Sequence, residues 1–141
     1  MAVNYIKRIL EANVYDVAVE SALSPANFLS QRLENTVLIK REDEQPVYSF
    51  KCRGAYNCII KKTPEERAKG IVTASAGNHA QGVALSAQKL GIKATIVMPS
   101  TTPEIKVASV RARGGKAILH GDTFDEAFAY SQKLVEEKGM T

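Results

Sequence analysis

Hydrophobic and polar positions follow two different spacings in the second half of the chain. Three short runs are mostly apolar and have the length of buried strands: 71–74, 93–98 and 116–119. The stretches after them repeat apolar residues at the three- and four-residue spacing of amphipathic helices: 79–90, 105–112 and 124–135. Strands and helices that alternate with short connections are typical of right-handed βαβ units. We therefore predict a three-layer α/β domain built on a parallel sheet.

Capping signals mark several helix ends in this region. The segments 63–66 and 123–126 each place a threonine three positions before a glutamate, which is the pattern of a capping box. Gly91 stands where a left-handed residue would end the helix that precedes it. These signals predict helices that begin after Thr63 and Thr123.

The first half of the chain has a less regular pattern. Residues 5–33 are predicted to form helical pieces broken near Pro25, with apolar residues that we expect to pack: Tyr5, Ile6, Ile9, Leu10, Phe28, Leu29 and Leu33. A β-branched run at 36–40 predicts a strand, and a helix is expected from Lys51 to about Lys62. We divide the chain into a helical lead-in with a first strand, 1–50, and a small α/β domain, 51–141.

The composition is that of an ordinary soluble globular protein, with 45% hydrophobic and 24% charged residues. The amino terminus resembles neither a secretory signal nor a membrane span, so we expect a cytoplasmic protein without a membrane partner. The net charge of +4 comes from scattered basic residues without interleaved aromatic ones, which argues against a nucleic-acid partner. Cys52 and Cys58 are expected to be reduced thiols, and no spacing of cysteines and histidines predicts a metal site.

Lys51 is the first candidate for chemistry. If Ser49 caps the helix that follows, Lys51 lies in its first turn, where the helix dipole disfavours a second positive charge by roughly 0.3–1 kcal/mol. One interpretation is a lysine that forms a Schiff base with a carbonyl compound. The alternative is an ordinary solvated lysine on a short helix. Gly54 costs about 1 kcal/mol in a helix interior, which predicts that something approaches the backbone there.

The second candidate is the turn from Ser75 to His79, which leaves a strand and enters a helix. The first N–H groups of a helix have no partner within it, so such a turn is suited to a carboxylate or a phosphate. Gly77 permits close approach of the backbone, while Ser75 and Asn78 add polar side chains. The alternative is that Ser75 and Asn78 only cap the helix.

Taken together, Ser-Phe-Lys-x-Arg-Gly-Ala at 49–55 and Ser-Ala-Gly-Asn-His-Ala-Gln-Gly at 75–82 resemble the serine/threonine dehydratase family of pyridoxal-phosphate enzymes, also called fold type II. The resemblance covers almost the whole chain, and further matching segments are 40–43, 45–46, 96–99 and 120–121. It implies pyridoxal 5′-phosphate as the cofactor and an amino acid as the substrate. The implied reaction is the conversion of L-threonine to 2-oxobutanoate and ammonia, a step toward isoleucine.

The resemblance also implies a role for each residue of the two motifs. Lys51 is similar to the lysine that holds the cofactor and moves the α proton of the substrate. Phe50 is similar to the aromatic residue that lines the cofactor pocket, and Asn78 to the partner of the cofactor's phenolic oxygen. The substrate carboxylate would be bound by the remaining residues of the turn: Ser75, Ala76, Gly77 and His79.

Two departures from the family pattern shape the expectations. The family has Thr-Pro-Leu or Ser-Pro-Leu before its first strand, whereas this chain has Ser21-Ala22-Leu23. The family's glycine-rich phosphate loop belongs downstream of Thr141, so we expect an amino-terminal part that lacks the rest of the large domain and any regulatory domain. Such a part is expected to be inactive alone, while the complete enzyme is expected to be a homo-oligomer.

Two other functions are compatible with the sequence. The chain could be a non-catalytic module that binds a carboxylate or a separate large-domain chain, or it could belong to a serine dehydratase or a racemase of the same family.

Overall fold

The centre of the molecule is a three-stranded parallel sheet, in a computed structural model that describes residues 3–141. Its strands, in spatial order, are β3 (Ile71–Ala74), β4 (Ala94–Met98) and β5 (Lys116–Leu119). The strands are in register, so that Thr73 pairs with Ile96 and Ile96 pairs with Ala117. The predicted parallel sheet is therefore confirmed, with all three apolar runs as its strands.

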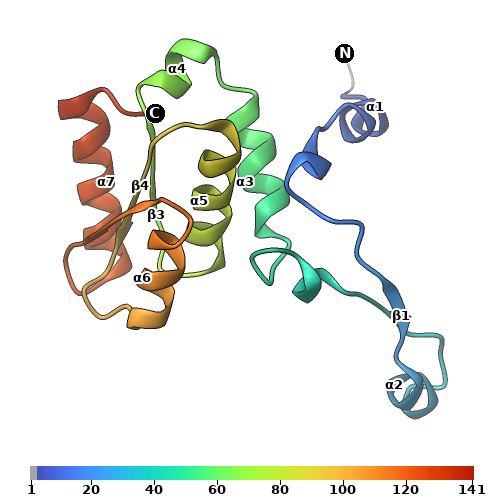
Figure 1. The fold of residues 1–141 in the computed structure, drawn as a ribbon. Coiled ribbons are helices and arrows are strands. Elements are labelled where there is room, and N and C mark those ends of the chain that lie inside the picture. Colours follow the sequence, from blue (N-terminus) through green and yellow to red (C-terminus); the bar gives the residue numbers. More distant parts are fainter. Residues whose placement is uncertain (1–2) are drawn as a thin grey trace.

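Helices cover both faces of this sheet (Figure 1). On one face, α5 (Asn78–Leu90) and α6 (Glu104–Arg111) pack on Ile71, Ile96 and Met98. On the other, α7 (Phe124–Lys138) packs on Val72, Val97 and Ile118. Successive side chains of a strand point to opposite faces, so alternate residues of β3 and β4 serve the two layers of helices. This is the predicted three-layer arrangement.

The short helix α4 (Pro64–Ala68) and the long helix α7 both begin with complete capping boxes, as predicted. In each box the threonine oxygen accepts the glutamate N–H and the glutamate carboxylate accepts the threonine N–H. Gly91 ends α5 with φ of +64°, the left-handed conformation that glycine adopts without steric cost.

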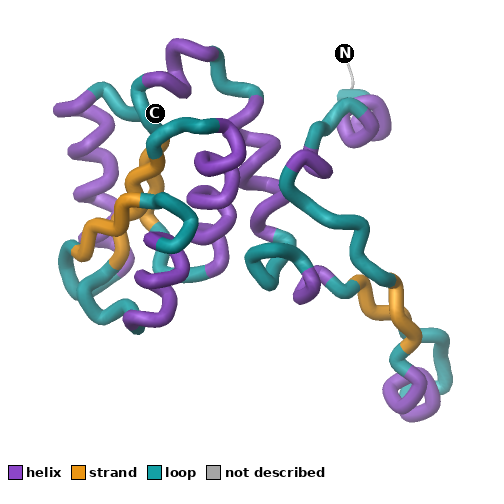
Figure 2. Tube along the Cα trace, in the orientation of Figure 1, coloured by secondary structure: helices purple, strands orange, loops and turns teal. Residues whose placement is uncertain are grey.

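The lead-in runs away from this domain as a separate arm (Figure 1). Its elements are α1 (Tyr5–Leu10), η1 (Val14–Asp16), β1 (Leu23–Pro25), α2 (Asn27–Arg32), β2 (Leu38–Lys40) and η2 (Glu42–Glu44). The strands β1 and β2 pair antiparallel in a small sheet of their own, visible in orange on the arm in Figure 2. The helical pieces predicted over 5–33 are present as α1, η1 and α2, and the break near Pro25 is also present, but it contains the strand β1, which was not predicted. The strand predicted at 36–40 exists, but it does not join the parallel sheet.

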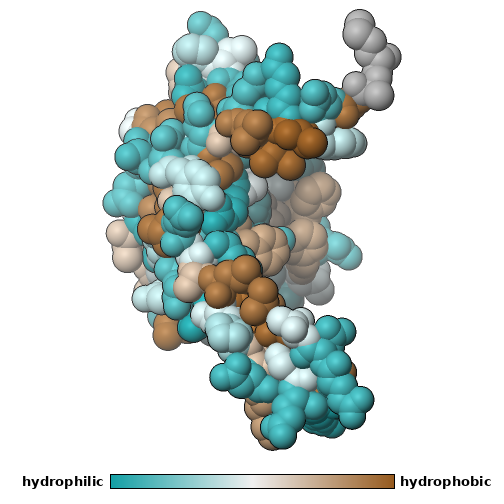
Figure 3. Space-filling view, turned by 90° about the vertical axis from the view of Figure 1, so that its right-hand side faces the viewer, coloured by the Kyte–Doolittle hydropathy of each residue, from teal (hydrophilic) through white to brown (hydrophobic). Residues whose placement is uncertain are grey.

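The apolar residues predicted to pack in the lead-in are exposed instead. All seven of the predicted packing residues are exposed, from 39% for Leu29 to 81% for Leu10. Hydrophobic side chains gather in several groups on this side of the molecule (Figure 3). The reason is geometric: α1 and α2 have only six residues each and project from the domain, so among residues 3–141 nothing covers their apolar sides.

The lead-in is nevertheless attached to α3 (Lys51–Ile60), the helix that packs along α5. Val17, Ala18 and Val47 form one buried cluster with Cys52 and Tyr56 of α3. This cluster joins residues on both sides of position 50. The division of the chain at that point stays a prediction.

Tyr56 provides the first testable expectation. Its hydroxyl donates a 2.7 Å hydrogen bond to Asp16, and burial together with this carboxylate raises the pKa of Tyr56 to about 12. Tyr56→Phe should lower the free energy of unfolding by about 1–2 kcal/mol, measured in urea. The wild type should lose stability as the pH rises from about 10 to 12, because the unfolded tyrosine ionises first. The variant should lack that loss.

Tyr48→Phe is the matched control, since Tyr48 is 76% exposed and its hydroxyl has no hydrogen bond among residues 3–141. Equal effects of the two substitutions would contradict a specific role for the bond between Tyr56 and Asp16.

Candidate active site

Lys51 is the first residue of α3, so its predicted place in the first helical turn is confirmed. The capping position is occupied by Phe50 and not by Ser49, which corrects the expected cap by one residue. The Ser49 hydroxyl still accepts the backbone N–H of Lys51 at 3.3 Å. The start of the helix is thus held by a side chain that precedes the cap.

The side chain of Lys51 is exposed, and its Nζ lies 5.1 Å from the centre of the Phe50 ring. This is the range of a cation–π contact, which at an exposed site contributes about 0.5–1 kcal/mol. Within the described part of the chain the amine has no hydrogen bond and no ion pair. No atom of residues 3–141 approaches Gly54, since a Cβ at this position would meet none of them within 4 Å, so an approach to its backbone stays a prediction.

The turn after β3 presents several backbone N–H groups. The Ser75 hydroxyl accepts two of them, from Gly77 at 3.3 Å and from Ala80 at 3.2 Å. Ser75 therefore bonds to the first turn of α5 from outside the capping position, which Gly77 occupies, while Asn78 is the first helical residue and not the cap. The hydroxyl proton of Ser75 can still be donated. The N–H groups of Ala76, Asn78 and His79 have no acceptor within residues 3–141. A carboxylate or phosphate oxygen is the kind of acceptor that suits such a turn.

The two motifs lie close together because α3 and α5 pack side by side (Figure 1). His79, in the first turn of α5, is half-buried, and its pKa is lowered by that burial and then by the positive charge of Lys51. Gly82, one turn further along α5, contacts the backbone of Lys51. Asn78 is exposed at the start of α5. The lysine and the turn therefore stand at neighbouring helix starts on the same side of the sheet.

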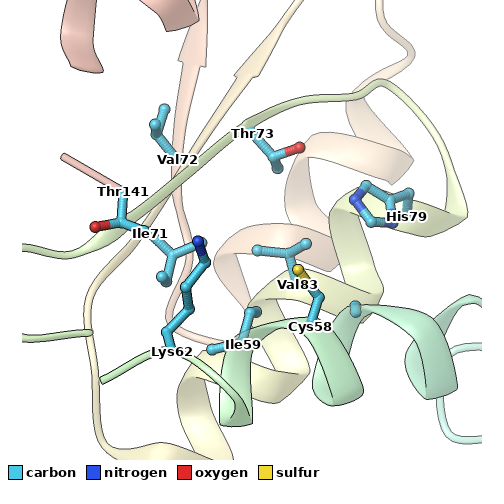
Figure 4. Close-up of a pocket in the computed structure, with 10 residues that line it drawn as sticks. Cys58, Ile59, Lys62, Ile71, Val72, Thr73, His79, Val83 and Thr141 are labelled. Carbon is cyan, nitrogen blue, oxygen red and sulfur yellow. The ribbon is translucent and has the colours of Figure 1, made fainter. Parts of the chain in front are cut away.

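His79 also lines a cavity of about 180 Å³ between α3, α5 and β3 (Figure 4). Its wall is mostly apolar, and its other polar side chains are Cys58 of α3, Lys62 just after α3, Thr73 and Thr141. His79 lines this cavity but Lys51 does not, so the cavity adjoins the candidate site without including the lysine. Cys58 is exposed and Cys52 is buried, and both are free thiols, as expected.

One polar cluster was missed by reasoning from sequence. Arg53 donates from Nε to Glu42 at 2.8 Å and from a second nitrogen at 3.0 Å, and Ser21 donates to the same carboxylate at 2.7 Å. Gln45 joins the cluster by donating to Glu42 at 3.2 Å, and it also makes paired bonds with the backbone of Val19 at 2.8 and 2.9 Å. The guanidinium, with the other donors, lowers the pKa of Glu42 to about 2.

The signal for this cluster was present, because Arg53, Glu42 and Gln45 all lie in segments that carry the family resemblance. Their mutual contact was not deducible, since eleven positions separate Glu42 from Arg53. The cluster ties the lead-in to the turn of α3 that holds Lys51.

None of the helices in the described range 3–141 is long and apolar enough to cross a membrane. Within that same range no three or more histidine, cysteine, aspartate or glutamate side chains are grouped as metal ligands.

Comparison with known proteins identifies relatives of this chain in sequence and in structure. A biosynthetic L-threonine dehydratase of Burkholderia multivorans is 54% identical over an alignment of 141 positions, which covers 98% of this chain and 28% of that protein. The processed form of threonine deaminase isoform 2 from Solanum lycopersicum is similar in structure, with a TM-score of 0.93 and 55% identity. The match covers 97% of this chain and 38% of that one. Maize serine racemase has a TM-score of 0.89 and 32% identity, over 95% of this chain and 41% of its own.

The chain thus spans little more than a quarter of the length of the curated dehydratase. A family model described as pyridoxal-phosphate dependent enzyme matches residues 16–141, which include both motifs and the whole parallel sheet. The chain therefore belongs to the family of pyridoxal-phosphate dependent enzymes.

Proposed function

We propose that this chain supplies the lysine and the substrate-binding turn of an enzyme that converts L-threonine to 2-oxobutanoate and ammonia. The observation that carries the proposal is the unpartnered amine of Lys51 beside a turn with free N–H groups at Ala76, Asn78 and His79. An amine and an anion-binding turn are the groups needed to hold an aldehyde cofactor and an amino-acid carboxylate. The dehydratase and deaminase relatives support threonine as the substrate.

When bound, pyridoxal phosphate would supply an aldehyde for covalent attachment and an electron sink for the pair left by the α proton. Lys51 would hold the cofactor through Nζ and carry that proton, because its amine has no competing partner within residues 3–141. Phe50 would line the cofactor pocket and Asn78 would bind the phenolic oxygen. The carboxylate of the substrate would be bound by the remaining residues of the turn: Ser75, Ala76, Gly77 and His79.

The exposed apolar side chains of the lead-in have no covering surface within residues 3–141, and we expect the chain to have little dehydratase activity by itself. We expect the 141-residue chain to release less than about a hundredth of the 2-oxobutanoate formed by the Burkholderia multivorans relative at saturating cofactor, because misplaced reacting groups lose about two orders of magnitude in rate. Release of 2-oxobutanoate from L-threonine can be followed directly. Turnover comparable to the relative would contradict this expectation.

A chimera tests the proposed function itself. This chain would replace the matching 28% of the Burkholderia multivorans dehydratase, and 2-oxobutanoate would be measured with L-threonine as substrate. We expect turnover by the chimera and none by the same chimera carrying Lys51→Ala. A folded chimera that binds the cofactor yet leaves threonine unchanged would refute the proposal.

The same chimera separates the alternatives. Faster formation of pyruvate from L-serine than of 2-oxobutanoate from L-threonine would favour a serine dehydratase, and formation of D-serine would favour a racemase, as in the maize relative's name. A chimera that binds amino acids without converting them would favour a non-catalytic module.

We also propose a place in isoleucine biosynthesis, a cytoplasmic location and a homo-oligomeric enzyme. The first rests on the word biosynthetic in the name of the bacterial relative, and the second on the composition of the chain. Growth without isoleucine of a bacterium that depends on the chimera tests the pathway. Light scattering that shows a monomer would contradict the homo-oligomer. A fluorescent fusion that localises to an organelle would contradict the cytoplasmic location.

A further inference from the structure

Gly82 is buried where α5 crosses the start of α3. A Cβ atom built there would lie 3.1 Å from both the carbonyl carbon and the oxygen of Lys51, and 3.2 Å from the nitrogen of Cys52. All three are backbone atoms, so no rotation of a side chain could relieve the contact. Any side chain at this position would have to displace the first turn of α3 by a few tenths of an ångström.

The backbone conformation does not explain the glycine. Gly82 lies within an α-helix and is not among the residues with positive φ, so an alanine could adopt the same φ and ψ. Alanine is also the better helix former. What glycine contributes here is the absence of a methyl group, which lets the two helix backbones approach each other.

We propose that Gly82 is a positioning residue, which sets the place of the Lys51 amine relative to the turn from Ser75 to His79. Gly82 follows Asn78 by four residues, so the two lie about one turn, or about 6 Å, apart along α5. The contact therefore fixes Lys51 one helical turn from the anion-binding N–H groups. This inference rests on the proposed function for its catalytic meaning, although the contact itself is independent of any cofactor.

The test compares Gly82→Ala with Gly54→Ala. Both substitutions add one methyl group to a helical glycine, but a Cβ at residue 54 meets no atom within 4 Å. In the 141-residue chain, pyridoxal phosphate and borohydride would be added and the reduced adduct at Lys51 counted by peptide mass spectrometry. We expect Gly82→Ala to reduce the adduct about tenfold, because a displacement of a fraction of an ångström is costly for a positioned nucleophile. Gly54→Ala should match the wild type.

A second readout needs no cofactor. Burial lowers the pKa of His79, and the charge of Lys51 lowers it further. The other titratable groups that line the cavity with His79 are Lys62 and Cys58. Titration of His79 by NMR should therefore give a different pKa in Gly82→Ala than in the wild type, with Lys51→Gln as the reference for complete loss of the charge. Gly54→Ala should leave it unchanged.

The outcomes are separable. A wild type that forms no adduct at Lys51 would count against the proposed function, while the His79 titration would still decide the role of Gly82. Unchanged adduct and unchanged His79 titration in Gly82→Ala would overturn the inference. Global unfolding of Gly82→Ala by circular dichroism, persisting in trimethylamine N-oxide, would overturn it as well, because the methyl group would then act on the core and not on Lys51.

Discussion

Lys51→Ala should abolish covalent capture of pyridoxal phosphate at this position, and Lys51→Arg should do the same. Alanine removes the amine, whereas arginine keeps a positive charge but stays protonated and cannot attack an aldehyde. We expect a loss of about 100-fold or more in the adduct recovered after borohydride reduction, the size of effect that follows removal of a reacting group. The measurement is peptide mass spectrometry of the segment that contains residue 51.

Lys62→Ala is the matched control for this experiment. Lys62 follows the end of α3, where its side chain lines the cavity beside His79 and is 38% exposed, and its 3.9 Å contact with Glu66 is a partly exposed ion pair whose loss should cost little. The variant should capture the cofactor at Lys51 as the wild type does. Equal labelling of several lysines in the wild type and in Lys51→Ala would show that Lys51 is an ordinary surface lysine.

Glu42→Gln should lower the free energy of unfolding by about 2–3 kcal/mol near pH 7. The folded chain holds the pKa of Glu42 at about 2 against 4.5 for an unperturbed glutamate, because Arg53 and Ser21 donate hydrogen bonds to the carboxylate. Each pKa unit corresponds to about 1.4 kcal/mol. Less than a quarter of each side chain of the pair is exposed, at 18% for Glu42 and 23% for Arg53, so solvent screens the interaction only in part.

The dependence of stability on pH follows from the direction of this shift. A carboxylate with a lowered pKa stabilises the fold fully above its unfolded pKa, here 4.5. That contribution should be lost as the pH falls from 4.5 to about 2, where the folded group also takes up its proton. Urea unfolding at a series of pH values should show a larger loss in the wild type than in Glu42→Gln, in which only the other carboxylates with lowered pKa values, Asp43, Glu65 and Glu126, still contribute.

Asp43→Asn is the control for this prediction. Asp43 pairs with Arg41 at 2.7 Å, but its side chain is 59% exposed, so the pair should contribute less than about 1 kcal/mol. A loss of stability in Asp43→Asn as large as that in Glu42→Gln would show that general charge effects, and not the cluster around Arg53, hold the lead-in to α3.

The elements of the α/β domain were predictable because their signals are local. Alternation of apolar runs and helical periodicities identified the three strands, and the two capping boxes predicted the starts of α4 and α7. The placement of Lys51 in a first helical turn and the motifs of the family followed from neighbouring residues in the same way. Each of these features depends on residues within a few positions of one another.

The tertiary structure alone decided which distant segments meet. The apolar side of α1 looks like a packing surface in the sequence, yet whether Ile9 is covered depends on what lies beside it in space. The pairing of β1 with β2, the cluster of Glu42 with Arg53, and the contact of Gly82 with Lys51 also join residues far apart in the chain. Periodicity reports the face that a residue occupies on its own helix or strand, whereas contact depends on how the elements pack against one another.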